Sequence, residues 1–135
     1  MTDFLWTARV YYEDTDSGGV VYYANYLKYM ERARTEWLRS FGIVQRELLR
    51  EHGVLFAVRS AHVDYLAPAK LDDVLAVSVR VERRGKASIT LHQDVKKERE
   101  ESVLCCARVK IASLDARSFK PCPIPKAVLE QIGPH

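Results

Sequence analysis

The 135-residue sequence predicts an α+β fold in which a large antiparallel sheet wraps around one long helix. Apolar residues recur at helical spacing between Asn25 and Phe41. By contrast, the segments 74–82, 87–96 and 103–114 alternate between apolar and polar residues, as strands do. The length fits one domain, which we expect to span residues 1–135.

The long helix is predicted from its apolar face and from both of its ends. The apolar positions lie three or four residues apart and comprise Tyr26, Met30, Ala33, Trp37 and Phe41. Asn25 is expected to cap the N-terminus, and Gly42 is expected to end the helix. A second, shorter helix is expected from about Val44 to Glu51, stopped by Gly53.

Three consecutive strands are expected to form an antiparallel meander. The first of them carries Val77, Val79 and Val81 on one face and polar residues on the other. Turns between the three strands are expected at Gly85 and at the charged residues 97–101.

Two further strands are expected outside the meander. Residues 7–13 lead as a short strand into a turn, and residues 54–66 form an apolar, β-prone stretch. A sheet curved around one helix leaves an unpaired edge, so dimerisation through edge pairing is expected. Three prolines then precede a short C-terminal helix or tail.

Composition and charge describe an ordinary soluble protein, which we expect to be cytoplasmic. No apolar run is long enough to span a bilayer, and no signal peptide is visible. The three cysteines and four histidines show no metal-ligand spacing, so neither a metal nor a cofactor is expected. The net charge of +3 is small and its basic residues are interleaved with acids, which argues against a nucleic-acid partner.

The segment that joins the first expected strand to the long helix makes the most specific chemical suggestion. It contains an acidic cluster and a glycine pair directly before the helix, comprising Glu13, Asp14, Asp16, Gly18 and Gly19. A carboxylate brought by a glycine turn to a helix N-terminus can attack a carbonyl group or activate water, while the helix N–H groups hold the developing oxyanion. These are requirements of acyl transfer. From the pattern alone, Asp16 could equally close an Asx-turn or cap the helix.

The chain resembles the hotdog-fold thioesterases in two segments, YYEDTDSGGVVYYANYLKYMERAR and, downstream, DYLAPAKLDDVLAV. Within the 4-hydroxybenzoyl-CoA thioesterase family, it is most similar to the Tol-Pal-associated (YbgC-type) acyl-CoA thioesterases, over roughly residues 8–125. The resemblance implies a five-stranded antiparallel sheet around a central helix and hydrolysis of an acyl-CoA to a free acid and CoA. It also implies homodimers or homotetramers with active sites at the subunit interface. Coenzyme A is part of the substrate, and acyl carrier protein is a candidate partner.

The resemblance assigns the catalytic carboxylate, as nucleophile or general base, to Asp16 and the oxyanion donor to the backbone N–H of Tyr23. Many YbgC-type members carry a histidine at the position of Tyr23, so an auxiliary role of an imidazole is in doubt for this chain. The N–H of Tyr22 is a second candidate donor. Further substrate contacts are expected from the turn, the helix and a basic hairpin, namely Gly19, Val20, Tyr22, Glu31, Arg83, Arg84 and Lys86.

Several alternatives remain open at this point. Glu31 could face the acyl pocket or pair with Arg34 on a solvated face. The basic hairpin could contact CoA phosphates or be a solvated turn without a ligand. The same groove could belong to a non-catalytic module that binds acyl-CoA or acyl carrier protein. It could also belong to a hydratase or dehydratase, although that chemistry usually needs an acid paired with a histidine, and no convincing histidine partner is visible.

Overall fold

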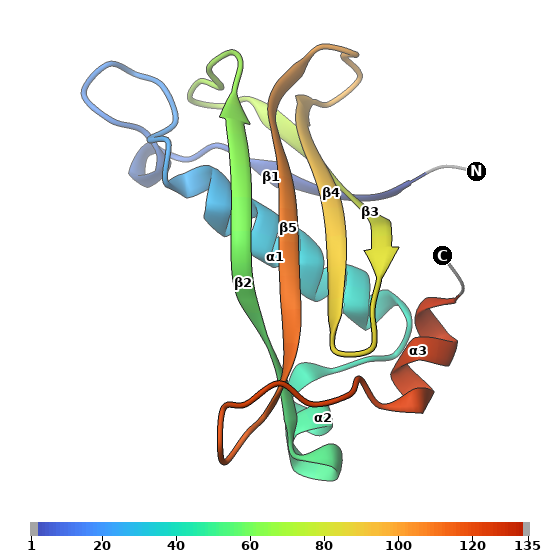
Figure 1. Ribbon diagram of the computed structural model, residues 1–135. Coiled ribbons are helices and arrows are strands. Elements are labelled where there is room, and N and C mark those ends of the chain that lie inside the picture. Colours follow the sequence, from blue (N-terminus) through green and yellow to red (C-terminus); the bar gives the residue numbers. More distant parts are fainter. Residues whose placement is uncertain (1–2, 134–135) are drawn as a thin grey trace.

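One sheet and one long helix make up most of the molecule (Figure 1). The structure is a computed structural model that describes residues 3–133. The strands are β1 (Phe4–Arg9), β2 (Val54–Tyr65), β3 (Val74–Arg84), β4 (Ser88–Lys97) and β5 (Val103–Asp115). The helices are α1 (Asn25–Ser40), α2 (Gln45–His52) and α3 (Lys126–Ile132), and a short 3₁₀ turn, η1, covers Tyr12–Asp14.

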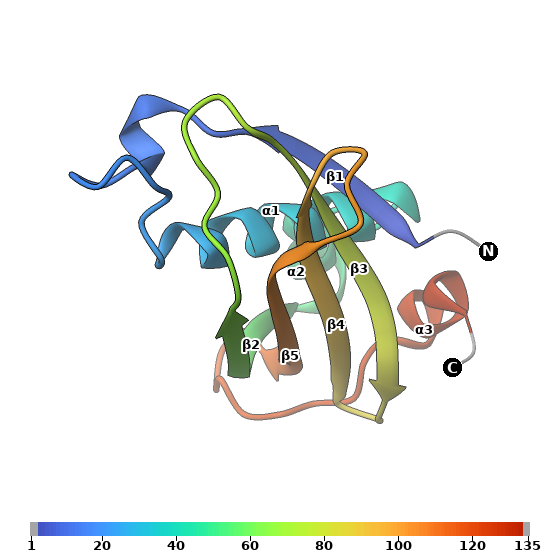
Figure 2. The same ribbon diagram turned by 90° about the horizontal axis from the view of Figure 1, so that it is seen from above.

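The five strands form one antiparallel sheet in the order β1-β3-β4-β5-β2. Seen from above, the sheet curves around α1 (Figure 2). The predicted meander is therefore confirmed as β3-β4-β5, and β1 and β2 are the two edge strands. The arrangement confirms the predicted hotdog fold.

The core lies between α1 and the concave face of the sheet. Alternation places the apolar residues of each strand on this face, where burial of a large aliphatic side chain contributes about 1.5–3 kcal/mol. The buried strand residues include Val77, Val79, Ile89, Leu91, Val95, Cys105, Ala107, Val109 and Ile111. From α1 they meet Tyr26, Met30, Ala33 and Trp37.

The ends of α1 and α2 show which capping predictions hold. Gly42 and Gly53 adopt positive φ angles of 80° and 64° and follow the two helices as expected. The prediction that Asn25 caps α1 is wrong, since Ala24 is the N-cap residue. Asn25 instead donates a hydrogen bond from Nδ2 to the carbonyl of Asp14, at 2.8 Å.

The prediction of a strand over residues 7–13 is also wrong in its boundaries. The strand begins at Phe4 and ends at Arg9. Beyond it, a carboxylate oxygen of Asp14 accepts a hydrogen bond from the Tyr11 N–H at 2.8 Å and closes η1. The carboxylate thus binds a backbone donor that a continuing strand would have used.

Candidate active site

Asp16 lies exposed in a tight turn between η1 and α1. Its Oδ1 accepts a hydrogen bond from the Gly18 N–H at 2.8 Å, which closes an Asx-turn. Its backbone N–H donates to the Val20 carbonyl at 2.9 Å, and its carbonyl accepts from the Gly19 N–H at 3.0 Å. Within residues 3–133 the other oxygen, Oδ2, accepts no hydrogen bond. The two interpretations of Asp16 are therefore compatible, since the turn fixes one carboxylate oxygen and leaves the other for chemistry.

The two glycines of this turn are required for different reasons. A Cβ atom on Gly18 would lie 3.2 Å from Asp16 Oδ1, tighter than ordinary van der Waals contact. Gly19 has a φ of 78°, which side-chain-bearing residues rarely adopt. The glycine pair thus shapes the backbone and keeps space for the carboxylate.

Backbone contacts fasten the turn to the segment that precedes β3. Val20 forms an isolated bridge with Lys70, and the Val21 N–H donates to the Ala69 carbonyl at 2.9 Å. The hydroxyl of Tyr26, on α1, accepts a hydrogen bond from the Ala69 N–H at 3.0 Å. The position of Asp16 is therefore set by two other parts of the fold.

Free main-chain donors lie at the start of α1. In the part of the chain that the structure describes, the N–H groups of Tyr23 and Ala24 have no hydrogen-bond acceptor. The Tyr22 N–H donates to the Asp14 carbonyl at 2.9 Å, so the prediction of Tyr22 as a second oxyanion donor is wrong. Ala24 offers the second free donor instead. The helix dipole adds partial positive charge at the same place.

Aromatic side chains form a wall beside these donors. The ring of Tyr23 lies 5.9 Å from that of Tyr65, at the end of β2, and Tyr65 lies 5.7 Å from Tyr26. A cavity of about 270 Å³ adjoins them, lined by Val21, Tyr23, Tyr26, Tyr65, Leu66, Ala67 and Pro68. Burial raises the pKa of Tyr26 and Tyr65, so both hydroxyls are neutral at pH 7. The sequence alone did not identify Tyr65, because β2 reaches α1 only through the curvature of the sheet.

The predicted basic hairpin lies between β3 and β4, far from the Asp16 turn of the same chain (Figure 1). Arg83 and Lys86 are exposed there. Arg84 is only partly exposed, and its guanidinium donates hydrogen bonds to the carbonyls of Leu129, at 3.2 Å, and of Gly133 at the end of α3. A contact of Arg84 with CoA would compete with this role, whereas Arg83 and Lys86 remain candidates.

Glu31 is exposed on α1 and lines a different cavity, between α1 and β2. The alternative in which it pairs with Arg34 does not hold at a 4.0 Å limit, because the described residues form no such ion pair. Arg34 turns instead to Gln93, a buried residue of β4.

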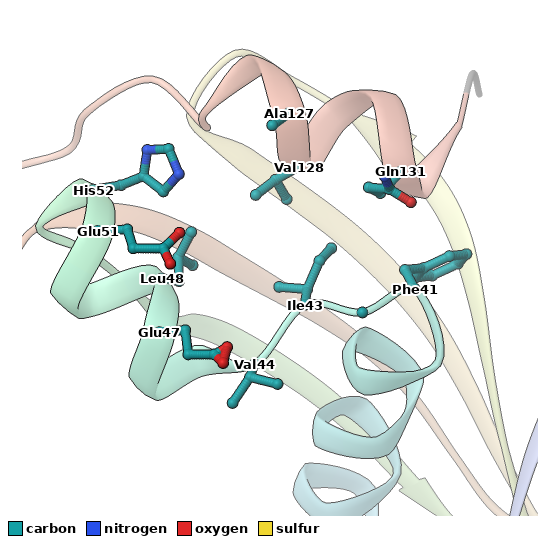
Figure 3. Close-up of a pocket in the computed structure, with 11 residues that line it drawn as sticks. Phe41, Ile43, Val44, Glu47, Leu48, Glu51, His52, Ala127, Val128 and Gln131 are labelled. Atoms are coloured by element: carbon teal, nitrogen blue, oxygen red, sulfur yellow. The ribbon is translucent and has the colours of Figure 1, made fainter.

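A second hollow lies between α2 and α3, as Figure 3 shows. It measures about 190 Å³, with Ile43, Leu48 and Val128 as apolar lining and Glu47, Glu51 and His52 on α2. It contains neither the Asp16 turn nor the free donors of α1. We therefore place the candidate active site at Asp16, where a carboxylate, main-chain donors and an apolar cavity occur together.

Metal-binding and membrane-spanning features were sought over residues 3–133. No three His, Cys, Asp or Glu side chains in that range lie close enough together to hold a metal ion. No helix in that range is long and apolar enough to cross a membrane.

A curved five-stranded sheet around one helix, with a carboxylate turn at the helix N-terminus, defines a hotdog-fold enzyme of the thioesterase class. The chain belongs to the thioesterase-like superfamily, whose model matches residues 10–132. It is 45% identical over 125 residues to the acyl-CoA thioesterase YbgC of Haemophilus influenzae, covering 93% of this chain and 90% of that protein. It is 41% identical over 130 residues to the acyl-CoA thioester hydrolase YbgC of Escherichia coli O6:H1, covering 96% of each.

Solved structures agree with this family. BH1999 gentisyl-coenzyme A thioesterase superposes with a TM-score of 0.83 at 26% sequence identity, covering 92% of this chain and 98% of that chain. The family resemblance found in the sequence is confirmed.

Proposed function

We propose that this chain hydrolyses an acyl-CoA thioester to a free acid and coenzyme A, with Asp16 as the catalytic carboxylate. The observation that carries the proposal is the pairing of the fixed Asp16 carboxylate with the free N–H groups of Tyr23 and Ala24. The relatives named as acyl-CoA thioesterases support the same reaction.

The chemistry follows from these groups. The thioester carbonyl oxygen would accept hydrogen bonds from the Tyr23 and Ala24 N–H groups, which stabilise the oxyanion of the tetrahedral intermediate. Asp16 Oδ2 then either takes a proton from the attacking water or attacks the carbonyl carbon to form a mixed anhydride, which water cleaves. Coenzyme A departs as a thiolate. A thiol pKa of about 8.5 makes this a good leaving group, so a full serine triad is unnecessary.

Two copies of the chain are proposed to pair through β2. This 12-residue strand forms one edge of the sheet and ends in exposed apolar residues, among them Tyr65 and Leu66. An unpaired strand of this kind readily pairs with another. Antiparallel pairing about a two-fold axis would bring the Val54 end of one β2 to the Tyr65 end of the other.

This pairing explains how the basic hairpin could serve the site. The hairpin lies at the Val54 end of the sheet and Tyr23 at the Tyr65 end (Figure 1). The hairpin of one copy, with Arg83 and Lys86, would therefore approach the Asp16 turn of the other copy and meet the CoA phosphates there. Two such dimers could associate into a tetramer.

The cellular setting is part of the same proposal. Three free cysteines suit a reducing cytoplasm, which we propose as the location. Acyl carrier protein could present the same thioester as CoA. Association with the Tol-Pal system has only the resemblance to YbgC-type proteins as support.

The test is release of free CoA thiol from short-chain, long-chain and aromatic acyl-CoAs by the wild type and by Asp16→Asn. Asparagine can keep the Asx-turn through its carbonyl oxygen, so the loss should be chemical, at about 10²–10⁴-fold in kcat. Glu13→Gln, which changes an exposed carboxylate of the neighbouring η1, is the matched control and should keep wild-type turnover.

Other outcomes have definite meanings. Wild-type turnover by Asp16→Asn would remove Asp16 from the chemistry. No turnover by a folded wild type that binds CoA would favour the binding module, and hydration of an enoyl-CoA would favour the hydratase.

A further inference from the structure

A short chain of polar groups crosses the otherwise apolar core. Gln93 lies on the concave face of β4 between Leu91 and Val95 and is 0% exposed. Its Nε2 donates a hydrogen bond to the Met30 carbonyl at 3.1 Å, and its Oε1 accepts one from Arg34 Nη1 at 3.0 Å. A buried amide at a position where the strand pattern calls for an apolar residue indicates a specific role, and here it holds the Arg34 guanidinium.

Arg34 is a largely buried cation without a counterion. Within residues 3–133 no carboxylate lies within 4.0 Å of it, and its hydrogen bond to Gln93 uses only one of its five N–H donors. Burial lowers the pKa of Arg34, and the charge of Glu31 opposes this shift. A cation removed from water is costly unless an anion pairs with it. The remaining donors are therefore free for an anionic ligand.

The space beside Arg34 can accept the end of an acyl group. A cavity of about 120 Å³ lies between α1 and β2, lined by Arg34 together with Leu38, Phe56, Val58 and Ile111. Arg34 follows Asn25 by nine residues, about 14 Å along the axis of α1, and helical side chains lean toward the N-terminus. A chain that begins at the Tyr23 donors and follows α1 on the β2 side would thus meet Arg34 after several carbon atoms.

We propose that Arg34 binds a carboxylate at the far end of the acyl group, so that the preferred substrate is the CoA mono-thioester of a medium-length dicarboxylic acid. This inference rests on the proposed function and names its substrate class. A guanidinium matches a carboxylate through two parallel hydrogen bonds, and Gln93 fixes its orientation. A neutral acyl chain would leave the same cation unpaired.

The test compares matched pairs of substrates: succinyl-, adipyl- and suberyl-CoA against butyryl-, hexanoyl- and octanoyl-CoA. In the wild type, kcat/KM should favour the carboxylate at one chain length. Arg34→Met should lower the ratio of carboxylate to neutral kcat/KM by about 10–100-fold, as expected for a lost charge-assisted hydrogen bond. Arg39→Met removes an exposed arginine of the same helix, paired with Glu36, and should leave the ratio unchanged.

A second variant tests Arg34 without removing it. Gln93→Glu places a carboxylate beside the guanidinium in nearly the same volume, so Arg34 should gain an internal counterion and the substrate preference should fall. Thermal unfolding of each variant verifies that it is folded.

Binding separates this inference from the proposed function. Non-hydrolysable thioether analogues of adipyl- and hexanoyl-CoA are titrated calorimetrically into the wild type and Arg34→Met. Tighter binding of the carboxylate analogue by the wild type alone supports the inference even if no substrate is hydrolysed. Equal binding of the two analogues overturns it. If Arg34→Met also converts a dimer into monomers, the guanidinium serves a second copy of the chain.

Discussion

At the residue scale, the main-chain turn at Asp16 matters as much as the carboxylate itself. The Gly18 N–H holds Oδ1, and the carbonyl of Val20 accepts the Asp16 N–H, so the side chain is positioned by its own neighbours. Small displacements of a reacting group are costly in catalysis. The geometry of a five-residue turn thereby becomes part of the proposed chemistry.

Gly18→Ala should separate activity from stability. The added methyl group would meet Asp16 Oδ1 at 3.2 Å and push the carboxylate from its place. We expect kcat to fall about 10–100-fold. The free energy of unfolding should change little, because alanine also restricts the unfolded chain. Steady-state kinetics and urea unfolding measure the two quantities.

Gly85→Ala is the matched control. Its methyl group would meet Ser88 Oγ at 3.3 Å, a similar crowding, but on the hairpin of the same chain far from Asp16. Equal losses of kcat in both variants would mean that crowding acts through the whole fold and not through the carboxylate.

The sequence identified Asp16 and the Tyr23 donor because they lie in one continuous motif. Arg34 and Gln93 escaped notice for the opposite reason. They are 59 residues apart, and only the packing of α1 on β4 brings them within 3.0 Å. On the sequence alone, Gln93 is one polar residue in an alternating strand and Arg34 one charge on a helix.

At the element scale, the basic hairpin divides into two functions. The partly exposed guanidinium of Arg84 donates to carbonyls at the C-terminal end of α3, where the partial charge is negative. This seven-residue helix is too short to be stable alone, so its docking contacts decide whether it forms. Arg83 beside it is exposed and makes no such contact.

Arg84→Ala should lower the free energy of unfolding by about 1–3 kcal/mol, because hydrogen bonds from a charged donor are lost. Amide hydrogen exchange should show α3 losing protection first. Arg83→Ala should change stability by less than about 0.5 kcal/mol. It should instead raise KM for acyl-CoA, and more so at low salt, if Arg83 contacts phosphate. The opposite distribution of effects would exchange the two roles.

The elements themselves were predictable wherever period and punctuation agreed. Alternation gave β3, β4 and β5, and Gly42 and Gly53 marked the helix ends. The start of the chain was misjudged because Asp14 redirected two groups by direct hydrogen bonds. Its carboxylate bound the Tyr11 N–H, and its carbonyl bound the Asn25 side chain. Such competition between side chain and backbone leaves no period in the sequence.

At the scale of the whole molecule, the proposed site is incomplete in one copy. The Asp16 turn and the basic hairpin lie at opposite ends of the sheet, while β2 remains an unpaired edge (Figure 1). Pairing through β2 would join these ends across two chains. Dimerisation would then be a requirement for binding CoA and not only for covering apolar surface.

Mixing two inactive variants tests this arrangement. One variant is Asp16→Asn, and the other carries Arg83→Ala with Lys86→Ala. If each site takes Asp16 from one copy and the hairpin from the other, half of the sites in a heterodimer are complete. Random reassembly should then restore about a quarter of the wild-type rate at low acyl-CoA concentration. No restoration after verified subunit exchange would place both features in the same copy.

The main-chain origin of the oxyanion donors also bears on how such an enzyme can diversify. The side chain of Tyr23 contributes nothing to the donor itself, being 61% exposed and stacked edge-on against Tyr65. Natural or laboratory selection can therefore substitute this position to reshape the acyl pocket while carbonyl polarisation is inherited unchanged. Residue 23 is a natural starting point for libraries that seek new acyl specificities on this scaffold.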